Sequence, residues 1–330
     1  VIPIAMHMST HAEPNASPAP LPGRSRAWPE EGYRRAPYWV YTDPDIYALE
    51  QQRIFRGRAW HYIGLEAEVP APERFKTTFI GDTPVILTRA SDGRLHAVVN
   101  RCAHRGNLVT REPFGSAAKL YCVYHAWSYT LAGDLSHAAF SQGLRGEGGL
   151  PADFDKSQHG LRTLRVDTLC GLVFASFCDD IEPLEQWLGD VAAGIRRVLH
   201  RPIKVLGYDT QRIHANWKTY HENPRDSYHA NILHTFYGTF GLSRQSQESA
   251  MTIDRSGRHV YFYTKAGTEK KSTDYDNTAN QLRSHNDQMK LEDASILRWH
   301  DEFGDGISVQ ILNAYPSFVD RKSTRLNSSH

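Results

Sequence analysis

Two short segments between residues 102 and 125 each offer one thiolate and one imidazole. Cys102 and His104 are separated by one residue, and Cys122 and His125 by two residues. Two loops carrying these side chains could present four ligands to one metal centre. A structural zinc site uses the same ligand types, but its usual patterns keep the cysteines together and the histidines together. Here each segment mixes the two types.

The mixed order favours a cluster of two irons and two sulfides, in which one iron takes both cysteines and the other takes both histidines. The elements C-x-H-R-G and C-x-x-H-x-W, with 17 residues between His104 and Cys122, resemble the Rieske signature. The resemblance implies that Cys102, His104, Cys122 and His125 bind a [2Fe-2S] cluster. A zinc-stabilised binding module remains the alternative, and it would be colourless whereas a Rieske protein is red-brown.

A second stretch, residues 216–234, is dense in groups that bind metals or move protons; it reads NWKTYHENPRDSYHANILH. His229 and His234 are five residues apart, which is about 140° around a straight helix. They converge only if the helix is distorted or ends between them. Because the chain has 17 histidines, a chance cluster is the alternative to a metal site.

The pattern N-W-K-x-x-x-E-N-x-x-D-x-Y-H-x-x-x-x-H resembles the mononuclear iron motif of Rieske non-haem iron ring-hydroxylating oxygenases, large (alpha) subunits. It follows the cluster motif in the order of that family, and the likeness extends from about residue 38 to about residue 320. The resemblance implies that His229 and His234 bind Fe(II). It also implies that Asp226 joins the cluster of one subunit to the iron of its neighbour, with a helix N-terminal charge as the alternative role.

The same resemblance implies redox partners and an assembly. A ferredoxin, an NAD(P)H-dependent reductase or both would deliver electrons, and an aromatic substrate would be hydroxylated with O2. A head-to-tail ring, either a homotrimer or an α3β3 assembly with a small β subunit, would bring the cluster of one copy near the iron of the next. A carboxylate hydrogen-bonded to a ligand histidine at each end fixes both imidazoles. Asp226 is therefore the predicted catalytic residue.

The third iron ligand is not found in the sequence. An iron site of this type takes two histidines and one carboxylate, and in the family the acid lies well downstream of the strand that matches residues 311–318. Residues 321–330 have no apolar pattern and resemble a read-through or assembly scar. We therefore expect a catalytic domain without its C-terminal part, and weak binding of mononuclear iron.

The stretch 234–244, HTFYGTFGLSR, resembles the branch of the family that acts on aromatic carboxylates such as salicylate, anthranilate or terephthalate. Four side chains could wall a flat apolar pocket, with plain core as the alternative: Phe236, Tyr237, Phe240 and Leu242. Arg244 could pair with a substrate carboxylate, with a surface role as the alternative. The alternative functions are a Rieske monooxygenase that removes methyl groups and a pure electron-transfer protein.

The remaining pattern predicts an α+β chain with two domains. Residues 1–36 read as a loosely ordered lead-in, and a Thr42-Asp43-Pro44 cap predicts a helix within 37–56 that belongs to the catalytic domain. Strands are predicted over 58–64, 75–80, 84–89 and 95–100, with a hairpin from 120 that turns at 132–134. Residues 57–178 thus form a small all-β Rieske domain that carries the cluster on its loops.

Beyond residue 182 the hydrophobic period becomes helical and predicts a helix over 183–200, followed by a strand over 205–214. Residues 179–320 form the catalytic mononuclear-iron domain, with a helix-grip-like antiparallel sheet, and 321–330 form a non-native tail. Trp217 and Tyr228 are predicted core residues.

Composition narrows the classes of partner. A net charge of +1 gives no field for nucleic acid or an anionic membrane, and no apolar run approaches the roughly 20 residues that span a bilayer. Of the four cysteines, Cys170 and Cys178 fall in one predicted strand, too far apart for a disulfide. We expect them to be buried thiols in a reducing, cytoplasmic compartment.

Overall fold

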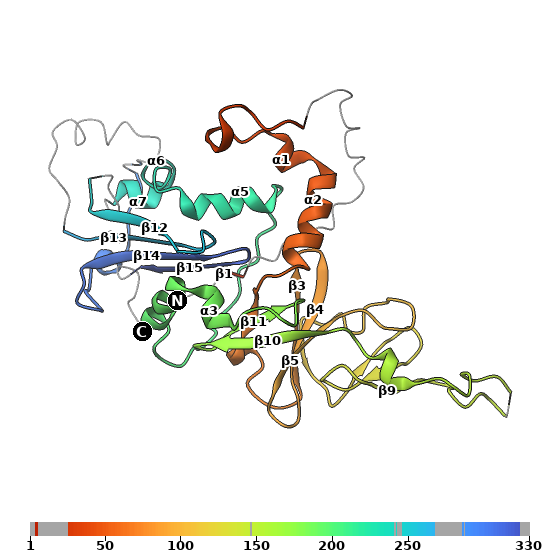
Figure 1. The fold of residues 1–330 in the computed structure, drawn as a ribbon. Coiled ribbons are helices and arrows are strands. Elements are labelled where there is room, and N and C mark those ends of the chain that lie inside the picture. Colours follow the sequence, from red (N-terminus) through yellow and green to blue (C-terminus); the bar gives the residue numbers. More distant parts are fainter. Residues whose placement is uncertain are drawn as a thin grey trace. The chain divides into compact units, whose positions relative to one another are not determined.

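The computed structural model describes residues 4–5, 26–145, 147–240, 242, 246–267, 286 and 288–323. These residues form two compact units, which can be followed along the ribbon in Figure 1. The N-terminal unit takes the described residues within 5–187 and 199–216, and the C-terminal unit takes those within 1–4, 188–198 and 217–330. The predicted domain boundary after residue 178 lies earlier in the chain than this division, and it does not anticipate the return of 199–216 to the N-terminal unit.

One of the first helices begins where the sequence predicts a cap. A 3-10 turn, η1 (Gly32–Arg34), precedes α1 (Trp39–Thr42) and α2 (Pro44–Glu50). The Asp43 side chain accepts the backbone N–H of Asp45 at 2.9 Å, and the proline has no N–H that would need a partner in the first turn. The predicted cap is confirmed.

A turn of π-helix, η2 (Gln51–Phe55), attaches these helices to the strands of the N-terminal unit. The Gln51 side chain accepts the backbone N–H of Asp82 at 2.9 Å, and Arg56 pairs with the Asp82 carboxylate at 2.6 Å. Residues 37–56 therefore lie in this compact unit, although they are predicted from the sequence to belong to the catalytic domain.

The N-terminal unit is built on a seven-stranded sheet in the order β2-β11-β10-β5-β4-β3-β6. Its strands are β2 (His61–Leu65), β3 (Arg74–Ile80), β4 (Thr83–Arg89), β5 (Leu95–Val99), β6 (Phe114–Ser116), β10 (Thr163–Leu169) and β11 (Leu172–Ser176). Neighbours pair antiparallel. The strands predicted over 75–80, 84–89 and 95–100 are confirmed to within one residue at each end.

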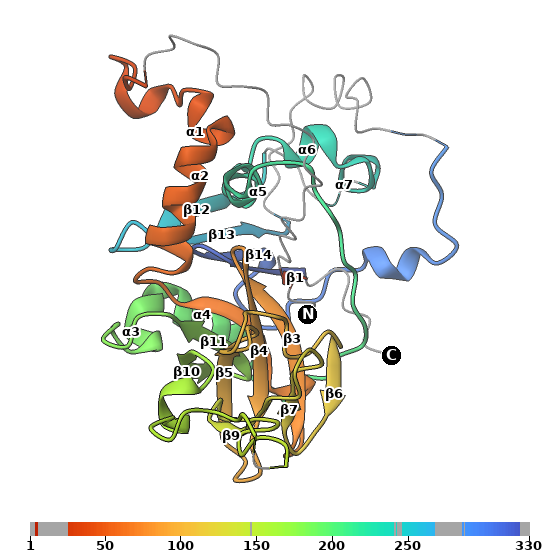
Figure 2. The ribbon, with the colours of Figure 1, turned by 90° about the vertical axis from the view of Figure 1, so that its right-hand side faces the viewer.

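A smaller antiparallel sheet, β7-β8-β9, completes this unit (Figure 2). It consists of β7 (Leu120–Tyr121), β8 (Ser128–Tyr129) and β9 (Leu135–His137). Two 3-10 turns, η3 (Glu66–Glu68) and η4 (Lys156–His159), also belong to this unit. One buried core joins the two sheets: Phe75, Ile86, Val98, Cys102, Val109, Leu120, Cys122, Trp127, Tyr129, Leu131, Leu135, Ala138 and Leu161. Both predicted cluster cysteines are part of this core.

The C-terminal unit carries a five-stranded sheet in the order β1-β15-β14-β13-β12. Its strands are β1 (Ile4–Ala5), β12 (Ser249–Ile253), β13 (Val260–Lys265), β14 (Ile307–Ala314) and β15 (Phe318–Ser323). The helices are α4 (Asp190–Val198), α5 (Trp217–Glu222), η5 (Asn223–Arg225), α6 (Ala230–Leu233), α7 (Thr235–Thr239) and η6 (Ala294–Leu297). The pairings from β12 to β15 are antiparallel, which confirms the predicted α+β class.

Helices α4 and α5 cover opposite faces of strand β14, as Figure 2 shows. The Gln310 side chain donates to the Gly194 carbonyl at 3.2 Å, and the Asn313 side chain donates to the His221 carbonyl at 3.1 Å. Side chains on a strand alternate between its two faces, so these two residues point to opposite sides. Strand β14 therefore anchors α5, the helix that leads into the second predicted metal site.

Several predicted elements differ from the structure. The helix predicted over 183–200 is two helices, α3 (Leu184–Leu188) and α4, because Gly189 adopts a φ of 52° between them. Glycine reaches this left-handed region without a steric cost and commonly ends helices. Residues 205–214, predicted as a strand, have no regular structure and are mostly exposed, since none of the described strands pairs with them. Residues 321–323 of the predicted tail lie in β15.

The strand predicted across Cys170 and Cys178 is in fact a hairpin. β10 ends at Leu169, and β11 begins at Leu172. Both thiols are free and half-buried rather than buried, because Cys170 lies in the turn and Cys178 follows β11. The Cys178 thiol donates to the Asp180 carboxylate at 2.9 Å.

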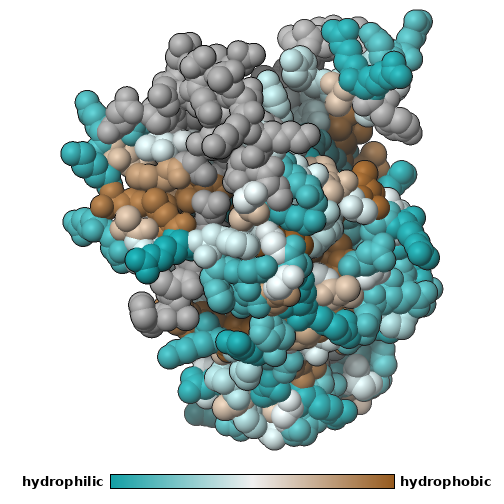
Figure 3. Space-filling model, turned by 90° about the vertical axis from the view of Figure 1, so that its left-hand side faces the viewer, coloured by the Kyte–Doolittle hydropathy of each residue, from teal (hydrophilic) through white to brown (hydrophobic). Residues whose placement is uncertain are grey.

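The visible surface in Figure 3 is mostly hydrophilic, with hydrophobic residues gathered in separate areas. Among the residues that the structure describes, no helix has both the length and the apolar character needed to cross a bilayer.

Candidate metal centres

The two predicted cluster loops have the same backbone form. In each loop, the N–H of the fourth residue after the cysteine donates to the cysteine carbonyl. Gly106 donates to Cys102 at 2.8 Å, and Ala126 donates to Cys122 at 3.0 Å. Gly106 and Ala126 also share a positive φ, 73° and 56°, which costs a non-glycine residue free energy. The structure maintains this strain in a loop that carries two predicted ligands.

The four predicted ligands separate into a buried end and an exposed end. Cys102 and Cys122 are 4% and 2% exposed, whereas His104 is exposed and His125 is half-exposed. The centroids of the two imidazole rings lie 4.6 Å apart. Two sulfurs inside and two imidazoles outside form the donor set of a cluster with one cysteine-ligated and one histidine-ligated iron. The residues present therefore fit a Rieske cluster.

The surroundings of Cys122 favour its thiolate form. Burial raises the pKa of the Cys122 thiol, but hydrogen bonds with the Tyr124 backbone, the Cys102 thiol and the Asn107 side chain outweigh burial and lower the pKa overall. The Asn107 amide nitrogen lies 3.8 Å from the sulfur. Since the thiolate is the form that binds metal, these contacts prepare the loop for a ligand role.

Tyr129 is a functional candidate that the sequence analysis missed. Its hydroxyl lies 3.0 Å from the Cys102 sulfur and accepts the backbone N–H of Ala103 at 3.1 Å. Because a hydroxyl has one hydrogen, the phenol can donate it to the sulfur. Burial raises the pKa of Tyr129, which keeps the hydroxyl protonated. Hydrogen bonds to the sulfurs are among the factors that set a cluster's reduction potential.

Aromatic rings support both predicted histidine ligands. The His104 ring stacks on Trp127 with centroids 4.8 Å apart and an angle of 11° between the rings. The His125 ring lies 3.8 Å from the ring of Tyr124, which is itself 59% exposed. Trp127 is the W of the C-x-x-H-x-W element, so the second motif supplies a wall for the ligand of the first.

In the second site, a helix end brings the two predicted iron ligands together. His229 lies immediately before α6 and His234 immediately after it, in an extended conformation. Their ring centroids lie 5.2 Å apart. The expected interruption of the helix is thus present, and two imidazoles converge as a metal pair requires.

Asn223 and Asp226 flank the His229 ring on its two nitrogen atoms. The Asn223 amide nitrogen lies 3.2 Å from Nε2, and an amide N–H can only donate, so Nε2 is the unprotonated nitrogen. Nδ1 then carries the proton and lies 3.3 Å from Asp226 Oδ2, without an aligned hydrogen bond. In this tautomer the Nε2 lone pair accepts the Asn223 N–H, and a metal ion at Nε2 would replace that hydrogen bond.

The Asp226 carboxylate is both ordered and accessible. Its Oδ1 accepts the backbone N–H of Tyr228 at 2.7 Å, and the side chain is 51% exposed. Tyr228, predicted to be core, is 69% exposed, whereas Trp217 is 3% exposed as predicted. The prediction for Tyr228 was wrong because the chain turns between η5 and α6 instead of continuing as an amphipathic helix.

The second site offers two imidazoles and no carboxylate as a third ligand among the described residues. Among all the residues that the structure describes, no three His, Cys, Asp or Glu side chains converge on one point that could hold a single ion. Partial burial lowers the pKa of His234, and Arg321 and His229 lower it further. His234 therefore favours the neutral form that binds metal.

The aromatic residues after His234 lie on α7 and just beyond it. Phe236 and Phe240 are half-buried with ring centroids 5.1 Å apart, and the Tyr237 ring lies 6.0 Å from that of Phe236. Leu242 is 2% exposed and is a core residue. Arg244, the predicted partner of a substrate carboxylate, lies outside the described residues.

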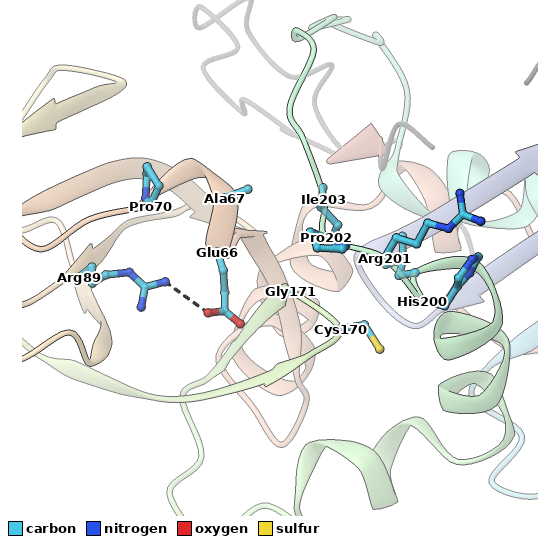
Figure 4. Close-up of a pocket in the computed structure, with 11 residues that line it drawn as sticks. Glu66, Ala67, Pro70, Arg89, Cys170, Gly171, His200, Arg201, Pro202 and Ile203 are labelled. Carbon is cyan, nitrogen blue, oxygen red and sulfur yellow. Dashed lines mark hydrogen bonds and ion pairs between the residues drawn. The ribbon is translucent and has the colours of Figure 1, made fainter. Parts of the chain in front are cut away.

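A separate cavity of about 450 Å³ lies in the N-terminal unit (Figure 4). It is lined in part by Glu66, Arg89, Cys170, His200 and Arg201, and Glu66 pairs with Arg89 at 3.3 Å. None of the predicted metal ligands lines this cavity.

The chain matches two families of protein domains. Residues 59–145 match the Rieske [2Fe-2S] domain, and residues 190–300 match the catalytic domain of the ring-hydroxylating alpha subunit. The first family implies a [2Fe-2S] cluster and the second a mononuclear iron.

Solved structures share the fold. Naphthalene 1,2-dioxygenase from Rhodococcus sp. superposes with a TM-score of 0.67 at 23% identity, over 87% of this chain and 64% of that one. A quaternary ammonium Rieske monooxygenase has a TM-score of 0.63 at 21% identity, over 87% of this chain and 68% of that one.

Curated relatives are closer in sequence. The chain is 46% identical to the alpha 2 subunit of the terminal oxygenase component of terephthalate 1,2-dioxygenase from Comamonas sp., over 86% of this chain and 69% of the relative. It is 43% identical to the anthranilate 1,2-dioxygenase large subunit from Burkholderia cepacia, over 93% of this chain and 74% of the relative. It is 42% identical to the large oxygenase component of salicylate 5-hydroxylase from Ralstonia sp., over 82% of this chain and 64% of the relative. The chain belongs to the family of Rieske-type ring-hydroxylating oxygenase large subunits.

Proposed function

We propose that this chain is the terminal oxygenase component of a Rieske non-haem iron system that hydroxylates an aromatic carboxylate with O2. The observation that carries the proposal is the pair His229 and His234, whose ring centroids lie 5.2 Å apart across α6. A Rieske protein that only carries electrons needs no such pair. The three relatives named for terephthalate, anthranilate and salicylate support the substrate class.

The proposed ligands are Cys102, His104, Cys122 and His125 for the cluster, and His229 and His234 for the mononuclear iron. When bound, the cluster supplies single electrons and the iron binds and activates O2. The chain itself positions these groups. The buried cysteines keep water from the sulfur end, and Asn223 and Asp226 hold the His229 ring between them, at its Nε2 and Nδ1 atoms.

The proposal extends to Asp226 as the link between two subunits. Its carboxylate is half-exposed, so a ligand histidine of a second copy can approach it from outside. A head-to-tail homotrimer or an α3β3 ring with a small β subunit would provide that second copy. A quaternary ammonium Rieske monooxygenase of the same fold uses inter-subunit electron transfer. We expect a ferredoxin, an NAD(P)H-dependent reductase or both as donors, in the reducing cytoplasm that the four free cysteines suit.

The aromatic side chains on α7 are the proposed wall for a flat substrate ring. Phe236 and Tyr237 are half-buried and follow His234 directly in the chain. Half-buried rings can still lose exposed apolar surface when a planar ligand stacks on them. A carboxylate on that ligand would need a cation nearby, for which Arg244 remains the sequence-based candidate.

A turnover comparison tests the proposed substrate class. The chain is supplied with saturating Fe(II), a ferredoxin, a reductase and NADH, so that the supply of iron and electrons does not limit the rates. Terephthalate, anthranilate and salicylate are compared with benzene, and hydroxylated product is measured. Product from at least one carboxylate and none with the His229→Ala variant would support the proposal. Product from benzene alone would contradict the carboxylate class.

Insertion of one oxygen atom is the second candidate reaction, because one relative at 42% identity is a salicylate hydroxylase. Demethylation by a related Rieske monooxygenase belongs to the same alternative. Mass analysis of products formed under ¹⁸O2 counts the oxygen atoms inserted per turnover. Two labelled atoms indicate a dioxygenase, and one labelled atom or loss of a methyl group indicates a monooxygenase.

A further inference from the structure

Arg225 lies between the two residues that flank His229, and its side chain points to a different part of the C-terminal unit. Arg225 is the last residue of η5. Its Nη2 donates to the backbone carbonyl of Arg258 at 2.8 Å. Arg258 belongs to the turn between β12 and β13. The contact therefore ties the short helix before Asp226 to the end of the sheet.

The turn that receives Arg225 is itself held firmly. Asp254 Oδ1 accepts the backbone N–H groups of Arg258 and His259, each at 2.9 Å, and Asp254 Oδ2 accepts the Ser256 hydroxyl at 2.6 Å. Hydrogen bonds to a charged acceptor are stronger than neutral ones. The carbonyl that Arg225 contacts is thus part of a rigid turn.

The same turn is connected to the neighbouring hairpin. His259 is fully buried, and its Nδ1 accepts the backbone N–H of Tyr315 at 3.1 Å, between β14 and β15. On β14, Asn313 donates to the carbonyl of His221 near the end of α5. Two hairpins and the end of α5 therefore form one hydrogen-bonded frame, and Arg225 connects η5 to it.

The segment that Arg225 attaches carries both groups that contact His229. Asn223 begins η5, and Asp226 follows Arg225 directly, with the Asp226 N–H donating to the Asn223 carbonyl at 3.2 Å. Asn223 lies 3.2 Å from His229 Nε2, and Asp226 lies 3.3 Å from Nδ1. A shift of η5 would move both contacts at once.

We propose that Arg225 is a positioning residue that fixes the Asn223 and Asp226 contacts to His229 by anchoring η5 to the β12–β13 turn. The inference deepens the proposed function, because the importance of His229 rests on its role as an iron ligand. Arg225 touches neither a substrate nor a ligand nitrogen. It acts through the geometry of the residues on either side of it.

The charge of Arg225 is suited to this role. Burial lowers its pKa, and Tyr315, Glu222 and Asp254 oppose that effect. A guanidinium in this place is therefore surrounded by groups that favour its charged form, and it also has the length to reach the Arg258 carbonyl. Lysine at this position would retain the charge and could reach the same carbonyl with a single N–H group.

The test compares Arg225→Met with Arg255→Met in the whole chain. Arg255 is an exposed residue of the same β12–β13 turn, so both variants lose one positive charge in one neighbourhood. The first measurement is hydrogen exchange of the Tyr228 amide, which donates to Asp226 Oδ1. We expect its exchange to become roughly tenfold faster in Arg225→Met, because local opening of the turn becomes easier, and to stay unchanged in Arg255→Met.

The second measurement is the binding of Co²⁺ as a probe of the histidine pair. Loss of a residue that orients a ligand histidine typically costs about 10- to 100-fold in metal affinity, so we expect a loss near the lower end for Arg225→Met. Arg225→Lys should restore part of the protection of the Tyr228 amide and part of the Co²⁺ affinity. Thermal melts set the working temperature below the transition of every variant, so that a purely structural loss does not enter the comparison.

Equal exchange rates and equal Co²⁺ affinities in Arg225→Met and Arg255→Met would overturn the proposal. If Arg225→Met shows faster exchange and weaker Co²⁺ binding but Arg225→Lys restores neither, the result would count against a role for the charge. The variants His229→Ala and His234→Ala report on the metal site separately. If neither weakens Co²⁺ binding, the proposed iron site fails, while the exchange of the Tyr228 amide still judges the role of Arg225.

Discussion

The hydroxyl of Tyr129 lies 3.0 Å from the sulfur of Cys102, in a core where both side chains are buried. A hydrogen bond to a ligand sulfur stabilises the more negative, reduced cluster. We predict that Tyr129→Phe lowers the reduction potential of the cluster. If one hydrogen bond of about 1 kcal/mol is lost, the one-electron potential falls by roughly 40 mV.

Protein-film voltammetry measures this potential, and Tyr121→Phe is the matched control. Tyr121 is 60% exposed on the neighbouring strand β7, so its hydroxyl should not influence the cluster. An unchanged potential in Tyr129→Phe would mean that this hydroxyl does not interact with a ligand sulfur.

A second prediction concerns Asp226. We expect Asp226→Asn to reduce turnover by roughly 10- to 100-fold, as for other residues that orient a metal ligand, while the visible spectrum of the cluster stays the same. The amide keeps an oxygen for the Tyr228 N–H but loses the charge that favours a protonated Nδ1 on His229. Turnover equal to that of the unchanged protein would mean that Asp226 is not needed to link the cluster to the iron site.

His61 predicts that the N-terminal unit is sensitive to acid. Burial lowers the pKa of His61 to about 4, below the value of about 6.5 expected in the unfolded chain. The unfolded state then binds more protons, so stability is greatest above pH 6.5 and is lost as the pH falls towards 4. The loss should amount to roughly 3 kcal/mol at the acid end.

Urea unfolding between pH 8 and pH 4 tests this dependence. His61→Phe keeps a flat ring beside Phe55, on which His61 stacks, and removes the titrating group. We expect a shallower fall of the unfolding free energy in this variant. Parallel curves for the two proteins would show that His61 does not titrate in this way.

We expect Asp320 to give the opposite dependence of folding stability on pH. Both of its carboxylate oxygens are buried and find no hydrogen-bond partner among the described residues, and burial raises the pKa of Asp320 to about 6. The folded state then holds its proton more tightly than the unfolded state, so Asp320 costs stability as the pH rises from 4 through 6. Asp320→Leu should stabilise the protein at pH 8 by roughly 3 kcal/mol.

Thermal and urea unfolding of Asp320→Leu provide the measurement. The control is Asp179→Leu at an exposed position, which should leave the unfolding free energy within about 0.5 kcal/mol. A loss of stability in Asp320→Leu would indicate that the carboxylate makes a favourable interaction in solution.

Local patterns predict much of this fold because their causes are local. Asp43 and Pro44 form the start of α2 where a cap and a proline are expected, and the alternating runs from residue 75 to residue 100 become β3, β4 and β5. Gly189 interrupts a helix that the hydrophobic period alone treats as continuous. Residues 205–214 have the composition of a strand, but a strand also needs a partner.

In the candidate sites too, residues with a local sequence pattern could be predicted, and residues whose contacts are distant in the chain could not. The spacing of cysteines and histidines predicts the cluster ligands, and the structure places both cysteines in one buried core and the two imidazole ring centroids 4.6 Å apart. Tyr129 was missed because its contact with Cys102 joins residues that are 27 positions apart. The role of Arg225 could not be predicted from the sequence either, since its partner is a backbone carbonyl 33 positions away. Every residue has such a carbonyl, so no residue type marks the contact.

The ligand set of the cluster is the central claim, and electron-nuclear double resonance on the dithionite-reduced chain tests it most directly. Coordination by His104 and His125 predicts hyperfine couplings from two imidazole nitrogens, in a red-brown protein whose cluster is lost in Cys102→Ala and Cys122→Ala. A paramagnetic cluster without nitrogen coupling would mean that all of its ligands are cysteines. A colourless, diamagnetic protein that contains zinc would contradict the account altogether.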